Sequence, residues 1–150
     1  MSSSASTGSC VFCDALAAPD AAALIVHRAT HCYVILNKFP YSNGHLMVVF
    51  NRHVARLADC AVDELNEAMA LTRTCEMALT EAYHPHGFNT GLNIGKPAGA
   101  GVVDHLHVHV VPRWNGDTNF MTVVGETRVL PEELHQSAAR LRPIFARIAG

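Results

Sequence analysis

A short row of histidines is the most prominent chemical feature of the sequence. In residues 105–111, HLHVHVV, every second side chain is an imidazole. Because successive side chains of a strand point to opposite faces, His105, His107 and His109 share one face. Burying three imidazoles together costs free energy unless each has a hydrogen-bond or metal partner. The pattern therefore predicts either a metal site or a nucleophile whose neighbours fix its tautomer and protonate a leaving group.

The cysteines point to a second kind of chemistry. Cys10 and Cys13 form a Cys-x-x-Cys pair, which supplies two of the four ligands that a tetrahedral structural zinc requires. The chain has five cysteines, an odd number without the dense spacing of a secreted scaffold, so we expect reduced thiols or a metal rather than disulfides. A redox pair and two buried small hydrophobes are the other interpretations of this motif, and no βαβ pattern follows it to favour the redox one.

The composition indicates what kind of protein carries these groups. A chain of 150 residues that is 49% hydrophobic and 16% charged can bury the core of one domain. We expect a tail at residues 1–9 and a single domain over 10–150. A net charge of −2 argues against nucleic acid as a partner. No apolar run is long enough to cross a bilayer, so we expect a cytoplasmic protein without a membrane partner.

Six segments rich in apolar and β-branched residues predict strands, and two amphipathic segments predict helices. A stripe at spacings of four and three predicts a long helix over Ala61–Ala82, with Asp59 as its N-cap. Pro131 is expected to open a C-terminal helix. Short adjacent strands with two helices favour an α+β fold with a mostly antiparallel sheet. The expected strands are Ala23–Ala29, His31–Asn37, His45–Phe50, Phe88–Ile94, His105–Val111 and Phe120–Val124.

Residues 105–111 match the histidine triad motif, His-φ-His-φ-His-φ-φ with φ apolar, and the flanking segments match as well. Over about Cys10–Val124 the sequence resembles the histidine triad (HIT) family, near the bacterial members of the fragile histidine triad and diadenosine tetraphosphate phosphorylase branch. The resemblance implies a HIT-like fold, in which a five-stranded, mostly antiparallel sheet carries a long helix and a C-terminal helix. The flanking matches are Asn37, Pro40, Gly44-His45, GFNTGLNIG at 87–95 and PRWNGD at 112–117.

The resemblance implies nucleotidyl transfer through a covalent enzyme-nucleotide. His107 is then the nucleophile that attacks the α-phosphorus, and His109 contacts phosphate oxygens and helps the leaving group depart. His105 is the first member of the triad. Asn93 resembles the polar residue that contacts the phosphate or the leaving group. An imidazole with its usual pKa of about 6.5 is neutral at pH 7, as this chemistry requires.

Further residues are assigned to nucleotide binding by the same resemblance. Asn37 matches a residue that hydrogen-bonds a ribose hydroxyl, although a turn-forming asparagine is the alternative. Ile35 is expected to line the base pocket, and His45 to support the triad from the neighbouring strand. Charge on the phosphate oxygens can be stabilised by backbone N–H groups of a glycine-rich loop. That loop contributes Gly99, Gly101 and Val102.

The resemblance also completes the metal site and suggests a dimer. Related proteins join a cysteine pair to two histidines around a structural zinc, which here adds His53 and His105 to Cys10 and Cys13. We expect no organic cofactor. Like the family, the chain is expected to form a homodimer across its long helix.

The predicted activity is cleavage of dinucleoside polyphosphates, such as diadenosine tetraphosphate, at the α-phosphate. Gly101 stands where many members have Ser or Gln, so backbone groups must replace that side chain, and the acceptor can be water or phosphate. A purine nucleoside phosphoramidase is the alternative enzyme. A nucleotide-binding regulatory protein with a degenerate site is the alternative outside enzymes.

Overall fold

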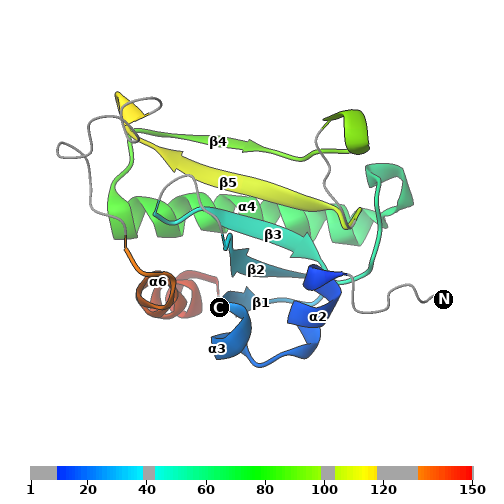
Figure 1. Cartoon of the computed structure of the whole chain (residues 1–150), viewed down its shortest axis with the longest axis horizontal. Coiled ribbons are helices and arrows are strands. Elements are labelled where there is room, and N and C mark those ends of the chain that lie inside the picture. Colours follow the sequence, from blue (N-terminus) through cyan, green and yellow to red (C-terminus); the bar gives the residue numbers. More distant parts are fainter. Residues whose placement is uncertain (1–9, 39–42, 99–103, 118–131, 150) are drawn as a thin grey trace.

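The computed structural model describes residues 10–38, 43–98, 104–117 and 132–149. Within these ranges one sheet has the strand order β1-β2-β3-β5-β4, and all neighbouring strands are antiparallel (Figure 1). The predicted α+β class and five-stranded sheet are therefore confirmed. The strands are Ile25–Arg28 (β1), Cys32–Leu36 (β2), Leu46–Phe50 (β3), Gly87–Gly91 (β4) and His107–Arg113 (β5).

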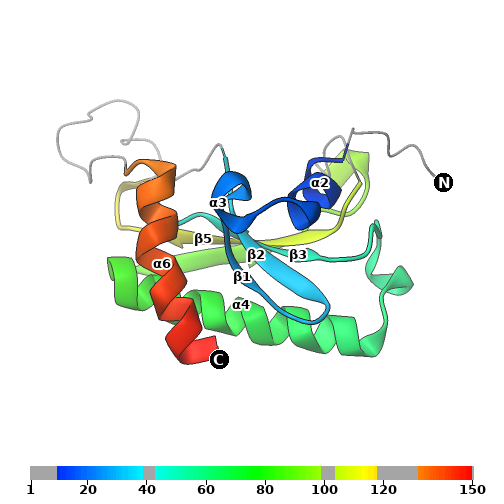
Figure 2. The same cartoon turned by 90° about the horizontal axis from the view of Figure 1, so that it is seen from below.

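Helices cover both faces of the sheet. The long helix α4, Val62–Tyr83, packs against β2, β3 and β5, and α6, Leu134–Ala149, packs against α4 and the edge strand β1. Two short helices, α2 (Val11–Ala17) and α3 (Asp20–Ala23), lie on the opposite face (Figure 2). The sheet thus separates the α4 layer from the α2–α3 layer, and any site beside α2 lies on the face away from α4.

The core lies around the two central strands. Every residue of β2 and β3 is buried, since α4 covers one face of these strands while α2 and α3 cover the other. Helix α4 completes the core on its own side of the sheet with Leu71, Cys75 and Leu79. All five cysteines are free thiols, as expected from their number and spacing. Among the described helices, none combines the length and the apolar character that crossing a bilayer needs.

Several element boundaries differ from the predictions. β4 ends at Gly91, so Asn93 follows the strand, and β5 begins at His107, so His105 precedes it. Two 3-10 turns, Leu57–Asp59 (η1) and Lys96–Ala98 (η2), were not predicted. The predicted strand Phe120–Val124, the tail at 1–9 and the loop residues Gly99, Gly101 and Val102 lie outside the described residues.

The beginning of α4 corrects the prediction for Asp59. Asp59 ends η1 instead of capping the helix, because Cys60 and Ala61 are extended and Ala61 takes the N-cap position. The N–H of Ala61, the residue before the helix, is bound by a side chain of the helix itself. It donates to Glu64 Oε1 at 2.7 Å. Arg52 reaches the same carboxylate with two hydrogen bonds of 2.7 and 2.8 Å. Glu64 is only 3% exposed and therefore depends on these partners.

Replacing Glu64 by glutamine is expected to destabilise the fold. The hydrogen bonds from Arg52, followed by that from Ala61 N–H, lower the pKa of Glu64 to about 2. We expect Glu64→Gln to lower the free energy of unfolding at pH 7 by about 1.5–3 kcal/mol. A lowered carboxyl pKa stabilises the fold above about pH 4.5 and is lost as the pH falls toward 2, so the difference should shrink over that range. Urea denaturation across pH measures it.

The control for this prediction is Glu76→Gln, which changes an exposed carboxylate on the same helix. It should alter the free energy of unfolding by no more than about 0.5 kcal/mol. Equal losses for the two variants at pH 7 would contradict the assigned role of Glu64.

Candidate functional site

The three histidines of the predicted row lie together at the start of β5. His107 and His109 are on the strand and face the α2 side of the sheet, while Val108 and Val110 belong to the opposite face. The ring centroids of His107 and His109 are 4.8 Å apart. His105, two residues before His107, is buried. The alternation predicted from the sequence is therefore present, although the regular strand begins only at His107.

The tautomer of His107 is fixed by the backbone carbonyl of His105. Its Nδ1 lies 2.7 Å from the carbonyl oxygen of His105, so Nδ1–H donates and Nε2 keeps its lone pair. Burial lowers the pKa of His107 below its usual value. The ring is therefore neutral at pH 7, with an unprotonated nitrogen available for nucleophilic attack.

His109 is supported from the neighbouring strand. His45 Nε2 lies 3.0 Å from His109 Nδ1, and Asn37 Nδ2 lies 3.3 Å from each ring nitrogen of His45. Since the His45 Nε2 is engaged by His109, the amide of Asn37 can donate to the Nδ1 of His45. His45 then carries its proton on Nε2 and donates it to His109. This order leaves an N–H donor on the outer nitrogen of His109.

A cavity of about 710 Å³ opens in front of this row. Its lining includes six residues expected from the sequence, namely Ile35, Asn37, Asn93, His105, His107 and His109. His45 lies behind His109 and is 1% exposed. Part of the remaining wall, which the sequence did not predict, comes from α2, α3 and their connections, with Phe12, Ala15, Ala18, Ala22 and Leu24.

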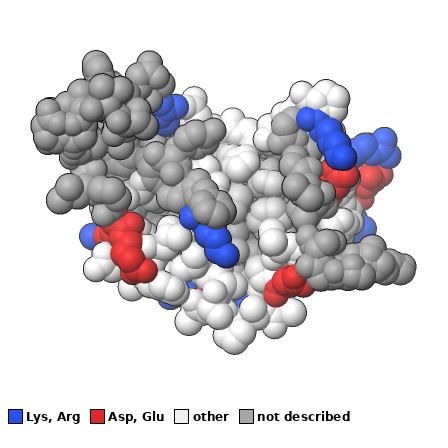
Figure 3. Space-filling model, viewed as in Figure 1, with Lys and Arg blue, Asp and Glu red and all other residues white. Residues whose placement is uncertain are grey.

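The lining of the cavity is mostly apolar, but it also holds polar groups and the charged side chains of Asp14, Lys38 and Asp104. Ile35 and Leu24 lie in the apolar part, whereas the imidazoles and Asn93 supply donors and acceptors. Most of the described surface on this side of the molecule carries no charged side chain (Figure 3). A ligand with an apolar ring and an anionic group suits such a cavity, since imidazole and amide donors and the cation of Lys38 are available to the anion.

The lowered pKa of the buried His45 predicts how the stability of the fold depends on pH. Burial, with the charges of His109 and His107, lowers the pKa of His45 to about 4. The unfolded chain, with an ordinary pKa of about 6.5, binds more protons between these values, so stability falls as the pH drops from 6.5 to 4. His45→Gln lacks this titration. Between pH 6.5 and 4 the variant should therefore lose less free energy of unfolding than wild type, by on the order of 3 kcal/mol, as measured by urea denaturation. The exposed His135 provides the control: His135→Gln should leave the slope unchanged.

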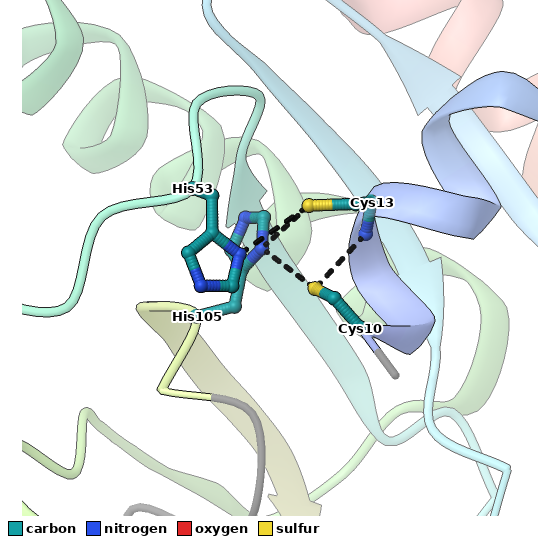
Figure 4. A group of neighbouring side chains, drawn as sticks. All are labelled: Cys10, Cys13, His53 and His105. Atoms are coloured by element: carbon teal, nitrogen blue, oxygen red, sulfur yellow. Dashed lines mark hydrogen bonds between the residues drawn. The ribbon is translucent and has the colours of Figure 1, made fainter. Parts of the chain in front are cut away.

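A second cluster of side chains adjoins the cavity. The sulfur atoms of Cys10 and Cys13 and the Nδ1 atoms of His53 and His105 all lie within 4.8 Å of one another (Figure 4). Cys10 Sγ is 3.3 Å from His105 Nδ1, and Cys13 Sγ is 3.3 Å from His53 Nδ1. The four side chains come from the start of α2, the segment after β3 and the residue before β5, and they converge on one point.

The cluster fits a tetrahedral metal ion. With bonds of about 2.3 Å to sulfur and 2.0–2.1 Å to nitrogen, zinc holds its sulfur and nitrogen ligands about 3.5 Å apart, close to the distances observed. His105 Nε2 lies 2.7 Å from the carbonyl oxygen of Phe50, which fixes the proton there and leaves Nδ1 free as a ligand. The N–H of Cys13 donates to Cys10 Sγ at 3.3 Å, an interaction that favours a thiolate.

Thiol ionisation supports the same assignment. Burial and the neighbouring Cys10 raise the pKa of Cys13 to about 11. Without a cation Cys13 would remain protonated at pH 7, and a bound divalent metal ion would convert it to a thiolate. The cluster can therefore hold a metal. A metal ion bound by all four side chains would have no open position, as in structural zinc sites and unlike catalytic ones.

Comparison with known proteins identifies the class to which this fold and site belong. A family model of the HIT domain matches residues 18–116. The chain belongs to the HIT family. A Zn-bound histidine triad family protein from Mycobacterium smegmatis has a similar structure, with a TM-score of 0.75 and 30% identity, over 94% of this chain and 96% of that one.

Two curated relatives carry names that describe an activity. The AP-4-A phosphorylase of Mycobacterium tuberculosis is 44% identical over 128 residues, which is 85% of this chain and 66% of that protein. The asymmetrical bis(5'-nucleosyl)-tetraphosphatase of Schizosaccharomyces pombe is 26% identical over 121 residues, 81% of this chain and 63% of that protein. The chain thus spans slightly less than two thirds of the length of each.

Proposed function

We propose that this protein cleaves dinucleoside polyphosphates at the α-phosphate through a covalent nucleotidyl-histidine intermediate on His107. The observation that carries the proposal is the ring of His107, whose Nδ1 is bound to the carbonyl of His105 while Nε2 remains unprotonated beside a cavity of about 710 Å³. The names of the mycobacterial and yeast relatives support this substrate class.

The first half of the reaction uses the two strand histidines. The lone pair of His107 Nε2 forms a bond to the α-phosphorus while the bond from phosphorus to the bridging oxygen breaks. The outer N–H of His109 donates a hydrogen bond to the departing polyphosphate oxygen, which leaves with the electron pair of the broken bond, and the chain from Asn37 through His45 supports this tautomer. In the second half, water or inorganic phosphate attacks phosphorus and gives up a proton to solvent, while the bond to His107 breaks and its electron pair returns to Nε2.

The rest of the cavity binds the nucleotide in this proposal. Ile35 and the apolar wall take the base, Asn37 takes a ribose hydroxyl, and Asn93 contacts the phosphate or the leaving group. Backbone N–H groups at Gly99, Gly101 and Val102, outside the described residues, stabilise the charge on the phosphate oxygens. A net charge of −2 supports a small nucleotide rather than a nucleic acid as the ligand.

A substrate panel tests the function. Purified protein is incubated with diadenosine tetraphosphate, diadenosine triphosphate and an adenosine phosphoramidate, each with and without inorganic phosphate. We expect turnover of the dinucleotides to exceed that of the phosphoramidate. Products made only with phosphate identify a phosphorylase, and products made without it a hydrolase. The opposite preference would favour a phosphoramidase, and AMP binding without any turnover would favour a regulatory binding protein.

We propose zinc as the ion of the Cys10, Cys13, His53 and His105 cluster, in a structural role. A bound zinc would tie the start of α2 to the segments around β3 and β5, and no step of the chemistry passes through it. The similarity to a Zn-bound family member and the donor set support zinc over other ions. The five free thiols support a reducing compartment, and we propose the cytoplasm.

We also propose a homodimer formed through α4. Val62 and Met69, both on α4, are 69% and 70% exposed, which is unusual for large apolar side chains near each other on one helix. Met69→Glu should convert a dimer to a monomer, as measured by sedimentation velocity, because a charge would be buried in the interface. The matched control is His135→Glu, which introduces the same charge at an exposed position of α6, outside α4. A wild-type protein that sediments as a monomer would contradict the proposal.

A further inference from the structure

Helix α2 takes part in both sites. It has seven residues, and its N-terminal turn carries the sequence Cys10-Val11-Phe12-Cys13. The two cysteines belong to the metal cluster. Phe12, between them, lines the cavity. The same turn of helix therefore supplies half of the metal ligands and part of the cavity wall.

The ring of Phe12 contacts the histidines of both sites. Its centroid lies 4.7 Å from that of His107 and 5.6 Å from that of His105. The side chain is buried at 9% exposure. A shift of the first turn of α2 would therefore move a ring that packs directly on the proposed nucleophile.

His105 provides a second connection between the sites. Its Nδ1 belongs to the metal cluster, while its backbone carbonyl accepts the Nδ1–H of His107. The metal would thus fix the residue whose carbonyl sets the tautomer of His107. Side chain and main chain of one residue serve different sites.

Other contacts of α2 hold mainly its later part. Tyr33 Oη donates to the carbonyl of Phe12 at 2.7 Å, and Arg28 donates to the carbonyls of Leu16 and Ala18. Both bonds from Arg28, which belongs to β1, are made at the exposed C-terminal end of α2. Apart from the bond of Tyr33 to Phe12, the side-chain bonds at the first turn that involve described residues come from the cysteine–histidine cluster. Loss of the metal is therefore expected to loosen the first turn while the helix stays attached.

We propose that metal binding and nucleotide binding are coupled, and that Phe12 is the positioning residue that couples them. A metal ion orders the first turn of α2 and seats Phe12 against His107. A nucleotide that packs on this wall then binds a preformed surface, whereas in metal-free protein it must order the turn itself. Coupling is reciprocal, so the nucleotide must raise the affinity for the metal by the same factor. The inference rests on the proposed nucleotide site.

Two affinities measured on the whole protein test the coupling. The dissociation constant of Zn²⁺ is determined by competition with a chromophoric chelator, with and without saturating AMP. The dissociation constant of AMP is determined by calorimetry on zinc-loaded and zinc-stripped protein. We expect AMP to tighten Zn²⁺ binding on the order of tenfold, and zinc removal to weaken AMP binding by the same factor. Circular dichroism of the stripped protein measures how much of the fold remains.

Two variants assign the coupling to Phe12. Phe12→Leu removes the ring and should reduce both factors to about twofold or less, while Zn²⁺ still binds. Phe145→Leu is the matched control, since Phe145 is buried in α6 and stacks on His27, remote from both sites. It should keep the full coupling. This pair also separates coupling from global unfolding of the stripped protein, because an effect of unfolding would persist in Phe12→Leu.

Each outcome distinguishes the two proposals. If AMP binds equally tightly with and without zinc, the coupling is wrong and the nucleotide site stands. If Phe12→Leu retains the full factor, the coupling runs by another route and the role of Phe12 is wrong. If AMP binds in neither metal state, the proposed function itself fails, and the coupling with it.

Discussion

His107→Asn is expected to reduce kcat for a dinucleoside polyphosphate by about 10⁴-fold or more. The amide of asparagine can still donate toward the carbonyl of His105, but it has no nitrogen lone pair able to bond to phosphorus. Steady-state assays measure the loss. Denaturing mass spectrometry of wild-type protein quenched during turnover should show a nucleotide adduct on His107, and the variant should show none.

The control variant is His135→Asn, an exposed histidine on α6. It should retain wild-type kcat. AMP should still bind to His107→Asn with a dissociation constant within about tenfold of wild type, because the apolar wall and Asn37 are unchanged. Turnover by His107→Asn within tenfold of wild type would rule out the covalent mechanism.

The second large effect concerns the metal cluster. Protein purified without chelators should contain close to one zinc per chain by elemental analysis, and Cys10→Ala should contain almost none. At a free metal concentration about 1,000 times the dissociation constant, binding stabilises the fold by about 4 kcal/mol, so Cys10→Ala should lose a comparable amount. Thermal or urea denaturation measures the difference.

Cys60→Ala provides the matched control for this loss. Cys60 is half-buried and lies outside the cluster, so this change should leave the zinc content unchanged. Zinc-free wild-type protein, or a Cys10→Ala protein with full zinc content, would contradict the metal assignment.

Regular patterns in the sequence predicted the elements that carry the chemistry. The alternation in residues 105–111 placed His107 and His109 on one face, because a strand permits no other arrangement. The stripe of the long helix predicted α4 to within one residue at each end. Such elements are set by local periodicity, and this is why they could be found without coordinates.

Features that depend on tertiary contacts were missed. The alanine-rich stretch of residues 15–23 has no apolar period, so nothing local indicated that α2 and α3 wall the cavity. Their position follows from distant partners, such as the hydrogen bonds of Arg28 to Leu16 and Ala18. Asp59 has the chemistry of an N-cap, but Glu64 takes that role because Arg52, twelve residues away, holds its carboxylate in place. The assignment of His53 to the cluster came from family resemblance alone.

The order of the strands has a consequence for synthesis of the chain. β1, β2 and β3 come from one contiguous segment, whereas β5 must pair with β3 after α4 and β4 have been made. Cys10 and His105 are 95 residues apart, so a nascent chain that exposes only its first half presents an incomplete set of donors. Tight capture of an ion by all four side chains must therefore wait until His105 has left the ribosome. Metal loading would then report that the last long-range strand pairing has been achieved.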